Sequence, residues 1–355
     1  MMRLNNFPII SDRRLKIGVV GCGRISKNHF GSILQYPEEL ELAAVCDIDG
    51  DVVKQAAAEY NVQGYTDFRN MLIHETLDLV VLCTPSGLHP SQAILAAEHG
   101  VHVVSEKPMA TRYNDGLRMV QACDEAGVRL FVVKQNRRNA TLQLLKRAID
   151  EKRFGAIKMV HLNVFWTRPQ DYYDHGQGWR GTWEFDGGAF MNQASHYVDL
   201  VEWLIGPVDR VQAMMSTTRE IEAEDTGVVN IKWRNGALGS MAVTMLTYPK
   251  NLEGSITILG ETGSVRVGGV AVNEIQTWDF ADQRDYDAEV RSANYETTSV
   301  YGFGHPLYYR NIIDVMRGTA EPETDGREGL KSLEFLTAAY MAARDGCSVG
   351  LPLHF

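Results

Sequence analysis

The sequence predicts an α/β protein of two domains, in which a doubly wound parallel sheet precedes an α+β domain with a mostly antiparallel sheet. Short apolar runs alternate with helical stretches over about the first 150 residues, as in parallel strands joined by helices. After about residue 155, apolar and polar residues alternate with period two, which favours antiparallel strands. The 355 residues are enough for two hydrophobic cores, and we expect domains at 1–138 and 139–355.

The apolar runs of the first half are expected to be buried parallel strands. The run Leu79–Leu82 (LVVL) is apolar at every position, which a strand covered by helices on both faces requires. The expected strands are Lys16–Val20, Leu40–Cys46, Leu77–Cys83, His102–Val104 and Leu130–Val133. The expected helices between them are Ile25–Gln35, Val52–Tyr60, Pro90–His99 and Asp115–Ala126.

The second half has the pattern of a sheet with one polar face. Val229, Ile231 and Trp233 alternate with polar residues, and Asn235-Gly236 after them is a strong signal for a two-residue hairpin. Expected helices lie at Thr141–Asp150, which would join the two halves, and near 311–316 and 329–343.

Charge and composition exclude several classes of protein. The 35 Lys and Arg residues against 45 Asp and Glu residues give a net charge of −10, so we expect neither nucleic acid nor an anionic membrane as a partner. No apolar run approaches the roughly 18 residues of a membrane span, and the first residues lack the apolar core of a signal peptide. The cysteines are scattered without a CxxC pair and the histidines form no ligand-spaced cluster. We therefore expect a cytoplasmic protein without a metal site.

A glycine-rich turn, Gly21 to Ser26 (GCGRIS), follows the first expected strand and begins a helix. Gly21 allows a tight turn, and Gly23 lets the backbone approach a pyrophosphate at the helix N-terminus. Ser26 stands where glycine or alanine is usual, but it is small enough for close packing. A tight strand-to-helix turn needs glycine in any case, so this turn alone leaves a purely structural interpretation open.

Asp47 ends the next expected strand, 24 residues after Gly23. An acid at about this spacing accepts hydrogen bonds from the adenosine ribose of a dinucleotide, and its charge repels a 2′-phosphate. No basic residue stands beside Asp47, so the sequence predicts NAD rather than NADP. The alternative for Asp47 is a plain helix cap, although Asp49 is also available for that role.

Further stretches resemble a known family. They are Cys83-Thr84-Pro85, Glu106-Lys107-Pro108 and residues 187–199 (GGAFMNQASHYVD). Together with the glycine-rich turn, they make the chain similar to the Gfo/Idh/MocA oxidoreductases over nearly its whole length. The resemblance implies an N-terminal Rossmann domain, a large open C-terminal sheet, and hydride transfer between a nicotinamide and a sugar or polyol carbon. It also implies a homotetramer (or a dimer).

Within that family, the chain resembles the bacterial UDP-N-acetyl-2-amino-2-deoxyglucuronate dehydrogenases. The stretches concerned are 133–139 (VKQNRRN), 178–181 (GWRG), 191–196 (MNQASH) and 302–309 (GFGHPLYY). The resemblance implies a nucleotide-sugar substrate, UDP-N-acetylglucosaminuronic acid (UDP-GlcNAcA), which is oxidised at its C3 hydroxyl during surface polysaccharide (O-antigen) biosynthesis. Another sugar or cyclitol dehydrogenase, an NAD-dependent glycosidase and a dinucleotide-sensing regulator remain alternatives.

The resemblance implies that Lys107 and His196 are catalytic. A lysine near a nicotinamide and a desolvated hydroxyl can have a lowered pKa, and a histidine titrates near neutrality, so either can take the hydroxyl proton. The structural alternatives are a surface lysine and a buried histidine. Family members commonly carry an aspartate four residues before the histidine, but here the residue is Asn192, which cannot hold a charge. Asn192, His196 and Asp199 are spaced as one face of a helix, and we expect Asp199 to be structural.

The remaining site residues follow from their positions and from the resemblance. Arg180, between two tryptophans, can bind a carboxylate through two parallel hydrogen bonds. Arg137, Arg138 and Arg310 are alternatives for this carboxylate or for the UDP pyrophosphate, and a solvated or ion-paired arginine is the structural alternative for each. Expected substrate contacts are Asn192, Arg180, Gln193, Arg137 and Tyr309. Expected cofactor contacts are Gly21, Gly23, Arg24, Ile25, Asp47, Thr84, Pro85, His89, Glu106, Lys107 and Gln135.

Overall fold

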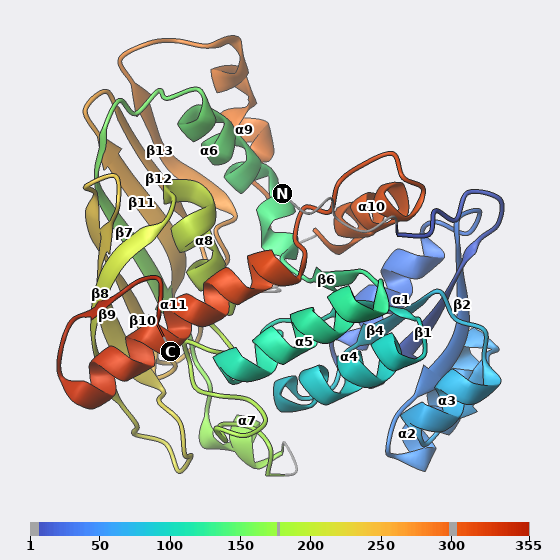
Figure 1. Ribbon diagram of the computed structural model, residues 1–355. Coiled ribbons are helices and arrows are strands. Elements are labelled where there is room, and N and C mark those ends of the chain that lie inside the picture. Colours follow the sequence, from blue (N-terminus) through green and yellow to red (C-terminus); the bar gives the residue numbers. More distant parts are fainter. Residues whose placement is uncertain (1–6, 176–177, 298–303, 355) are drawn as a thin grey trace. The chain divides into compact units, whose positions relative to one another are not determined.

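The computed structural model describes residues 7–175, 178–297 and 304–354 (Figure 1). The chain forms two compact units. The first comprises the chain up to Lys134 together with His305–Leu330, and the second comprises Gln135–Gly304 and the chain from Lys331 onward. The segment His305–Leu330 lies far beyond residue 138, where we expect the first domain to end, yet it packs with the first unit.

The first unit contains a sheet of parallel strands in the order β3-β2-β1-β4-β5-β6. The order reverses beside β1, so the predicted doubly wound sheet is confirmed. The strands are β1 (Leu15–Val20), β2 (Leu40–Cys46), β3 (Gln63–Tyr65), β4 (Leu79–Leu82), β5 (His102–Ser105) and β6 (Leu130–Val132).

The expected helices of this unit lie between the strands, and the structure adds a short helix and a 3₁₀ turn. They are α1 (Ser26–Leu34), α2 (Gly50–Tyr60), α3 (Phe68–His74), the 3₁₀ turn η1 (Ser86–Leu88), α4 (His89–Glu98), α5 (Tyr113–Ala126) and α10 (His305–Met316). The short β3 and α3 were not predicted, because Gln-Gly-Tyr has no apolar run and α3 has only seven residues. Asp67 fixes the start of α3 by accepting a hydrogen bond from the Asn70 N–H at 2.7 Å.

The core of the first unit joins β1, α1 and α10. Ile17 of β1, Ile33 of α1 and Ile313 of α10 belong to one buried apolar cluster. The end of β6 is tied to the returning segment as well, because Tyr308 and Thr324 both donate hydrogen bonds to the Val132 carbonyl, at 2.9 and 2.8 Å. Helix α10 is therefore part of the first unit, although it lies near the end of the chain.

The second unit contains an eight-stranded sheet in the order β13-β12-β11-β7-β10-β9-β8-β14. The pair β7/β10 is parallel and the other pairs are antiparallel, which confirms the mostly antiparallel sheet. The strands are β7 (Ile157–Phe165), β8 (Val208–Ser216), β9 (Thr226–Trp233), β10 (Leu238–Thr244), β11 (Glu253–Gly260), β12 (Gly263–Gly268), β13 (Glu274–Phe280) and β14 (Val349–Gly350). A hairpin joins β9 to β10 as predicted, but its loop is not the expected two-residue turn. The Trp233 N–H donates to the Ala237 carbonyl at 3.0 Å across a loop of three residues, in which only Gly236 has a positive φ, of +90°.

One face of this sheet is covered by helices. Val229, Ile231 and Trp233 of β9 are buried on that face, and the Trp233 indole donates a hydrogen bond to the Val201 carbonyl at 3.0 Å. The helical elements are η2 (Gln135–Arg138), α6 (Ala140–Asp150), α7 (Gln170–Asp174), α8 (Ser195–Ile205), η3 (Asp285–Glu289), α9 (Val290–Ala293) and α11 (Gly326–Asp345), which begins in the first unit. Across the described ranges, no helix has both the length and the apolarity of a bilayer span.

Removing a buried side chain from α10 should therefore destabilise the first unit. Ile313 is fully buried, so we expect Ile313→Ala to cost about 2 to 5 kcal/mol of unfolding free energy in a urea titration. Leu307 on the same helix is 51 % exposed, and Leu307→Ala should cost less than about 1 kcal/mol. Equal losses in the two variants would contradict the packing of α10 described above.

Candidate active site

The two glycines of the turn after β1 have different structural requirements. Gly21 has a φ of +88°, and a Cβ there would lie 2.8 Å from the carbonyl carbon of Cys83. A Cβ on Gly23 would meet none of the described atoms within 4 Å. The fold therefore requires glycine at 21, whereas the open space at 23 suits the approach of a phosphate group.

The N-terminus of α1 is open to an anion. The first turn of α1 contains no acidic residue. The residue at the N-cap, Ile25, makes no side-chain hydrogen bond to the N–H groups of that turn. Buried Ser26 donates a hydrogen bond from Oγ to the Gly23 carbonyl at 2.7 Å, which explains serine at the third position of the motif. Arg24 is exposed on the same turn. These features leave backbone N–H groups and the positive helix end available to a pyrophosphate.

Asp47 lies against this turn rather than capping a helix. Its Oδ2 accepts a hydrogen bond from the Cys22 N–H at 2.8 Å, and Oδ1 accepts one from the Asp49 N–H at 3.1 Å. Asp49 itself caps α2, by accepting from the Asp51 N–H at 2.9 Å. The carboxylate of Asp47 thus lies beside the glycine-rich turn, where it can accept hydrogen bonds from a ribose diol.

The thiols around the turn are packing groups. Burial raises the pKa of Cys22 and of Cys46 to about 12, and Asp47 adds to both shifts. Burial also raises the pKa of Cys83 well above its usual value. These thiols therefore stay protonated and unreactive near neutral pH.

The end of β4 is tied to the loop that carries the predicted catalytic lysine. His89 is buried, and its ring nitrogens contact the Thr84 carbonyl at 2.9 Å and the Pro108 carbonyl at 3.0 Å. The Lys107–Pro108 peptide is cis. The Thr84 hydroxyl donates to Gln92 at 2.6 Å, and Pro85 precedes the 3₁₀ turn η1. His89 thus positions this loop.

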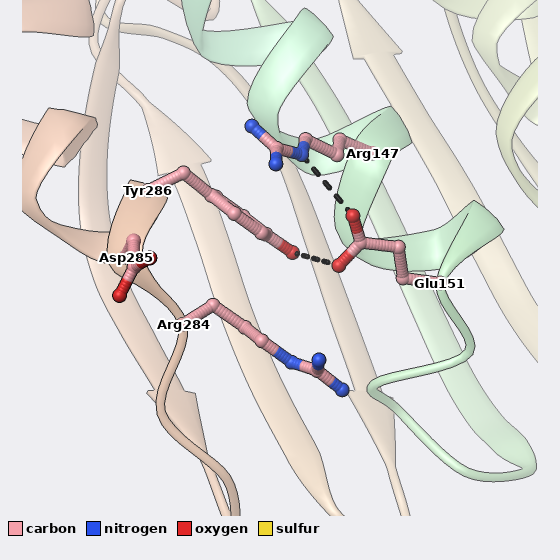
Figure 2. A pocket seen from close by; sticks show the side chains of 5 residues that line it. All are labelled: Arg147, Glu151, Arg284, Asp285 and Tyr286. Carbon is pink, nitrogen blue, oxygen red and sulfur yellow. Dashed lines mark hydrogen bonds and ion pairs between the residues drawn. The ribbon is translucent and has the colours of Figure 1, made fainter.

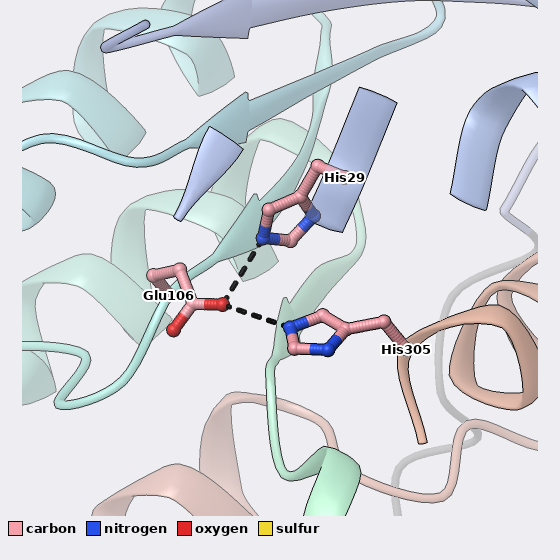
Figure 3. A group of neighbouring side chains, drawn as sticks. All are labelled: His29, Glu106 and His305. Carbon is pink, nitrogen blue, oxygen red and sulfur yellow. Dashed lines mark hydrogen bonds and ion pairs between the residues drawn. The ribbon is translucent and has the colours of Figure 1, made fainter. Parts of the chain in front are cut away.

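Glu106 lies in a buried cluster with two histidines (Figure 3). Its Oε1 lies 3.0 Å from His29 Nε2 and 3.6 Å from His305 Nε2, while Oε2 accepts a hydrogen bond from the Lys107 N–H at 3.0 Å. Burial opposes ionisation, but His29 and His305 hold the pKa of Glu106 well below its usual range. Tyr309, predicted to bind substrate, is also buried here, with its hydroxyl 2.8 Å from His29 Nδ1.

This cluster bears on the expectation that the protein has no metal site. The nitrogen and oxygen atoms of His29, Glu106 and His305 lie within 4.8 Å of one another, and such a set can bind a transition metal. Both ring nitrogens of His29 already have hydrogen-bond partners in Tyr309 and Glu106. The absence of a metal stays a prediction.

In the second unit, α8 begins later than predicted. It starts at Ser195, so His196 and Asp199 lie on the helix, whereas Asn192 lies in the preceding turn, and the prediction of one shared helical face is wrong. The reason is a tight turn after Gly187, which has a φ of +75°; in it Ala194 N–H donates to the Ala189 carbonyl at 2.8 Å. The Asn192 amide donates to Asp186.

His196 and its neighbours are buried. His196 is 4 % exposed, and its Nε2 lies 3.2 Å from the amide nitrogen of fully buried Gln135. Asp199 accepts two hydrogen bonds from the Arg137 guanidinium, at 2.6 and 2.7 Å, and its structural role stays a prediction. This pairing engages Arg137, which was predicted to contact substrate. Gln193 is also buried.

Arg180 is held by aromatic side chains. Its guanidinium lies 4.4 Å from the ring centre of Tyr172 and 5.3 Å from that of Trp179, and it donates to the Tyr172 carbonyl at 2.6 Å. Its Nε is buried and has no hydrogen-bond partner among the described residues. A buried donor without a partner is costly, so a carboxylate ligand would complete this group.

Sequence reasoning missed Glu224, which supports the segment before α8. Its Oε1 accepts hydrogen bonds from the Phe190 N–H at 2.9 Å and the Tyr340 hydroxyl at 3.0 Å. A Cβ on Gly188 would lie 2.0 Å from Oε2, which explains that glycine. Burial, and to a lesser extent Asp225, raises the pKa of Glu224 to about 7. An acid just before an apolar strand pattern was the only signal in the sequence.

The charged pocket on the second unit lies elsewhere (Figure 2). It is lined by Arg147, Glu151, Arg284, Asp285 and Tyr286. The Arg147 guanidinium stacks 3.8 Å from the Tyr286 ring centre, and Glu151 accepts hydrogen bonds from both residues. These groups satisfy one another, and none of the predicted site residues lines the pocket.

Two family models together match most of the chain. The NAD-binding Rossmann fold of the Gfo/Idh/MocA oxidoreductases matches residues 15–134, and the C-terminal alpha/beta domain of the same family matches residues 146–351. The chain belongs to the Gfo/Idh/MocA oxidoreductase family. The predicted family, enzyme class and NAD cofactor are thereby confirmed for this Gfo/Idh/MocA oxidoreductase.

Solved structures include two that are similar over the whole chain. The WlbA dehydrogenase from Bordetella pertussis, in complex with NADH and UDP-GlcNAcA, is 64 % identical, covers 97 % of this chain and all of its own, and has a TM-score of 0.95. The WlbA dehydrogenase from Chromobacterium violaceum, with the same two ligands, is 62 % identical over all of both chains, with a TM-score of 0.94. A D-apiose dehydrogenase from Paraburkholderia graminis is 27 % identical over 96 % of this chain and 90 % of its own.

The predicted site residues divide between the two units of this Gfo/Idh/MocA oxidoreductase. The first unit brings together the glycine-rich turn, Asp47, and the ends of β4 and β5 with Lys107. The second unit brings Gln135 against His196, and Arg137 against Asp199. Lys107 and His196 thus belong to different units, and their catalytic roles stay predictions.

The contrast between the two glycines is testable. Gly23→Ala should leave the melting temperature within about 2 °C of wild type but weaken NAD binding at least tenfold in calorimetric titration, because only the phosphate needs that space. Gly21→Ala should lower unfolding free energy by more than about 1 kcal/mol, because of its backbone conformation and close contact. If Gly23→Ala binds NAD as tightly as wild type, Gly23 does not provide the space for the phosphate, and the proposed difference between the two glycines is wrong.

Glu224 should make stability depend on pH. Its pKa is raised in the folded protein, so the unfolded chain loses this proton first, and stability falls as pH rises from about 4.5 to about 7. We expect Glu224→Gln to abolish this part of the slope, on the order of 3 kcal/mol, in urea unfolding at pH 5 and pH 8. Glu222, exposed in the same loop, provides the control, and Glu222→Gln should keep the wild-type slope.

Proposed function

We propose that the chain is an NAD-dependent dehydrogenase that oxidises the C3 hydroxyl of UDP-GlcNAcA to the 3-keto sugar. The observation that carries this proposal is the 62–64 % identity, over essentially the whole chain, to two dehydrogenases that hold NADH and UDP-GlcNAcA. The more distant relatives include a D-apiose dehydrogenase and a myo-inositol 2-dehydrogenase, each only 27 % identical. A different sugar or cyclitol substrate is therefore the second candidate.

The first unit has the features that NAD requires. The open space at Gly23, the uncapped start of α1 and the Asp47 carboxylate suit a pyrophosphate and a ribose diol. Bound there, NAD⁺ would supply the acceptor for the hydride that leaves C3 of the sugar. Glu106, through the Lys107 N–H, and His89, through the Pro108 carbonyl, hold the loop that presents the Lys107 side chain.

The second unit supplies groups for the sugar and its proton. As hydride leaves C3, the C3 O–H bond breaks, and the neutral His196 ring takes the proton while a C=O bond forms. Lys107 polarises the hydroxyl. Arg180 binds the uronic acid carboxylate, because its Nε still lacks a partner among the described residues. Gln193 and Asn192 lie on the turn that leads to His196.

The resemblance noted in the sequence also implies a cellular setting and an assembly. We propose that the enzyme acts in the cytoplasm, in the biosynthesis of a surface polysaccharide such as O-antigen, and that it assembles as a homotetramer (or a dimer). Native mass spectrometry of the purified protein would report both the number of subunits and any retained dinucleotide or nucleotide sugar.

The activity is tested by NADH formation at 340 nm with UDP-GlcNAcA, with a 2-oxoacid added where NADH must be recycled. Lys107→Ala should lose at least about 100-fold in kcat even at saturating NAD, because it removes a group that acts on the hydroxyl. Lys54→Ala, at an exposed position on α2, should behave as wild type. Turnover of inositol or free sugars but not UDP-GlcNAcA would overturn the substrate assignment.

A further inference from the structure

We propose that Arg168 binds the diphosphate of the nucleotide sugar, next to Arg180 on its carboxylate, and thereby selects a nucleoside diphosphate sugar over a free sugar. This inference rests on the proposed function and deepens it, because it names a contact for the part of the substrate that lies beyond the reacting sugar. Arg168 lies in the second unit, between β7 and α7, and its side chain is half-buried.

Arg168 and Arg180 lie against the same aromatic ring. The ring centre of Tyr172, on α7, lies 5.4 Å from the guanidinium carbon of Arg168 and 4.4 Å from that of Arg180. Each guanidinium is anchored to the main chain through Nη1. Arg168 donates to the Thr167 carbonyl at 2.7 Å, and Arg180 donates to the Tyr172 carbonyl at 2.6 Å. Two cations are thus held close enough for one ligand to reach both.

Each of these guanidinium groups keeps a donor for a ligand. Besides its bond to Thr167, Arg168 makes only one long contact, from Nη1 to the Asn251 side-chain oxygen at 3.4 Å. The Nη2 groups of Arg168 and Arg180 make no hydrogen bond with any residue that the structure describes, and neither is fully buried. A guanidinium binds phosphate or carboxylate oxygens through such groups, with charge-assisted hydrogen bonds.

Neither arginine forms an ion pair with an acid in the described parts of the chain. The acids around them have other partners or point to solvent. Asp186 accepts from the Gly181 N–H at 2.8 Å, and Glu222 accepts from the Trp183 N–H at 3.1 Å. Asp171, on α7 itself, is exposed. Two neighbouring cations repel each other, so an anionic ligand would lower the electrostatic energy of this region.

The loop before β9 brings a third arginine to α7. Gln170, the first residue of α7, accepts a hydrogen bond from the Glu220 N–H at 2.9 Å and donates one to the Glu220 carbonyl at 3.3 Å. Arg219 precedes Glu220, and its Nε is buried without a partner among the described residues. UDP-GlcNAcA carries two negative charges on its diphosphate and one on its carboxylate. Its charge therefore complements this region of an otherwise acidic protein, whereas a neutral sugar has no group for it.

The two arginines differ in their connection to the turn before α8. Gly181, next to Arg180, donates to Asp186, and Asp186 also accepts from Asn192 in that turn. The side chain of Arg168 has no such connection in the described structure. In the substrate, the carboxylate belongs to the ring that reacts, and the diphosphate leads away from it. Arg180 therefore suits the carboxylate, and Arg168 suits the diphosphate.

The proposal is tested by calorimetric titration with UDP, in the presence of saturating NADH so that the dinucleotide site is filled. Arg168→Gln should weaken UDP binding at least about tenfold, because it removes charge-assisted hydrogen bonds to the diphosphate. Arg180→Gln should keep the UDP dissociation constant within about threefold of wild type, but weaken UDP-GlcNAcA binding at least about tenfold. Arg291→Gln, at an exposed position on α9, should bind both ligands as wild type does.

Steady-state kinetics separate a binding role from a merely structural one. Arg168→Gln should raise KM for UDP-GlcNAcA at least about tenfold and keep kcat within about threefold, because the diphosphate takes no part in the hydride transfer. If Arg168→Gln does not fold, Arg168→Lys replaces it. That variant keeps the charge but not the planar pair of donors, and it should weaken UDP binding about three- to tenfold.

Three outcomes would overturn the proposal. The first is a folded Arg168→Gln or Arg168→Lys variant that binds UDP as tightly as wild type. The second is an equal loss of UDP affinity in Arg168→Gln and Arg180→Gln, which contradicts the assignment of one anion to each arginine. The third is a wild-type protein that, with NADH bound, does not bind UDP.

The use of UDP alone separates this inference from the function on which it rests. If UDP binds through Arg168 but UDP-GlcNAcA gives no NADH with the wild-type protein, the substrate assignment fails and the diphosphate contact stands. If UDP-GlcNAcA is oxidised but UDP affinity does not depend on Arg168, the dehydrogenase assignment stands and only the role of Arg168 fails.

Discussion

The first unit depends on the interactions of one buried carboxylate, that of Glu106. One of its oxygens interacts with His29 from α1 and with His305 from α10. The other oxygen accepts a hydrogen bond from the main-chain N–H of Lys107. An ionised carboxylate inside a protein is tolerated only when such partners surround it. The charge of Glu106 therefore links α1, which follows the glycine-rich turn, to the loop that carries Lys107 and to α10.

The fold was predictable where the signal is local. The apolar run Leu79–Leu82 and the glycine-rich turn specify their structures through neighbouring residues alone, and each is found as expected; the hairpin near Asn235-Gly236 is also present, although its loop is one residue longer than predicted. The strand β3 and the placement of α10 were not predictable in this way. The three residues of β3 are a strand only because β2 lies beside them, and α10 packs against residues nearly three hundred positions earlier.

The site shows the same limit. Residue type and spacing made Gly23 and Asp47 candidates, and the family resemblance made His196 one; their roles stay predictions. Neither signal identified which partners the side chains choose. Arg137 pairs with Asp199, Tyr309 turns to His29, and Asn192 turns to Asp186. Such pairings depend on which distant segments meet, and Glu224 was missed because no motif surrounds it.

The return of residues 305–330 to the first unit has a consequence for dissecting the protein. A fragment that stops after β6 would contain the whole parallel sheet, yet it would expose the apolar surface that Ile312 and Ile313 cover and leave Glu106 without His305. Such a fragment is expected to be insoluble. A minimal nucleotide-binding module would instead require the two distant pieces to be fused through a short artificial linker.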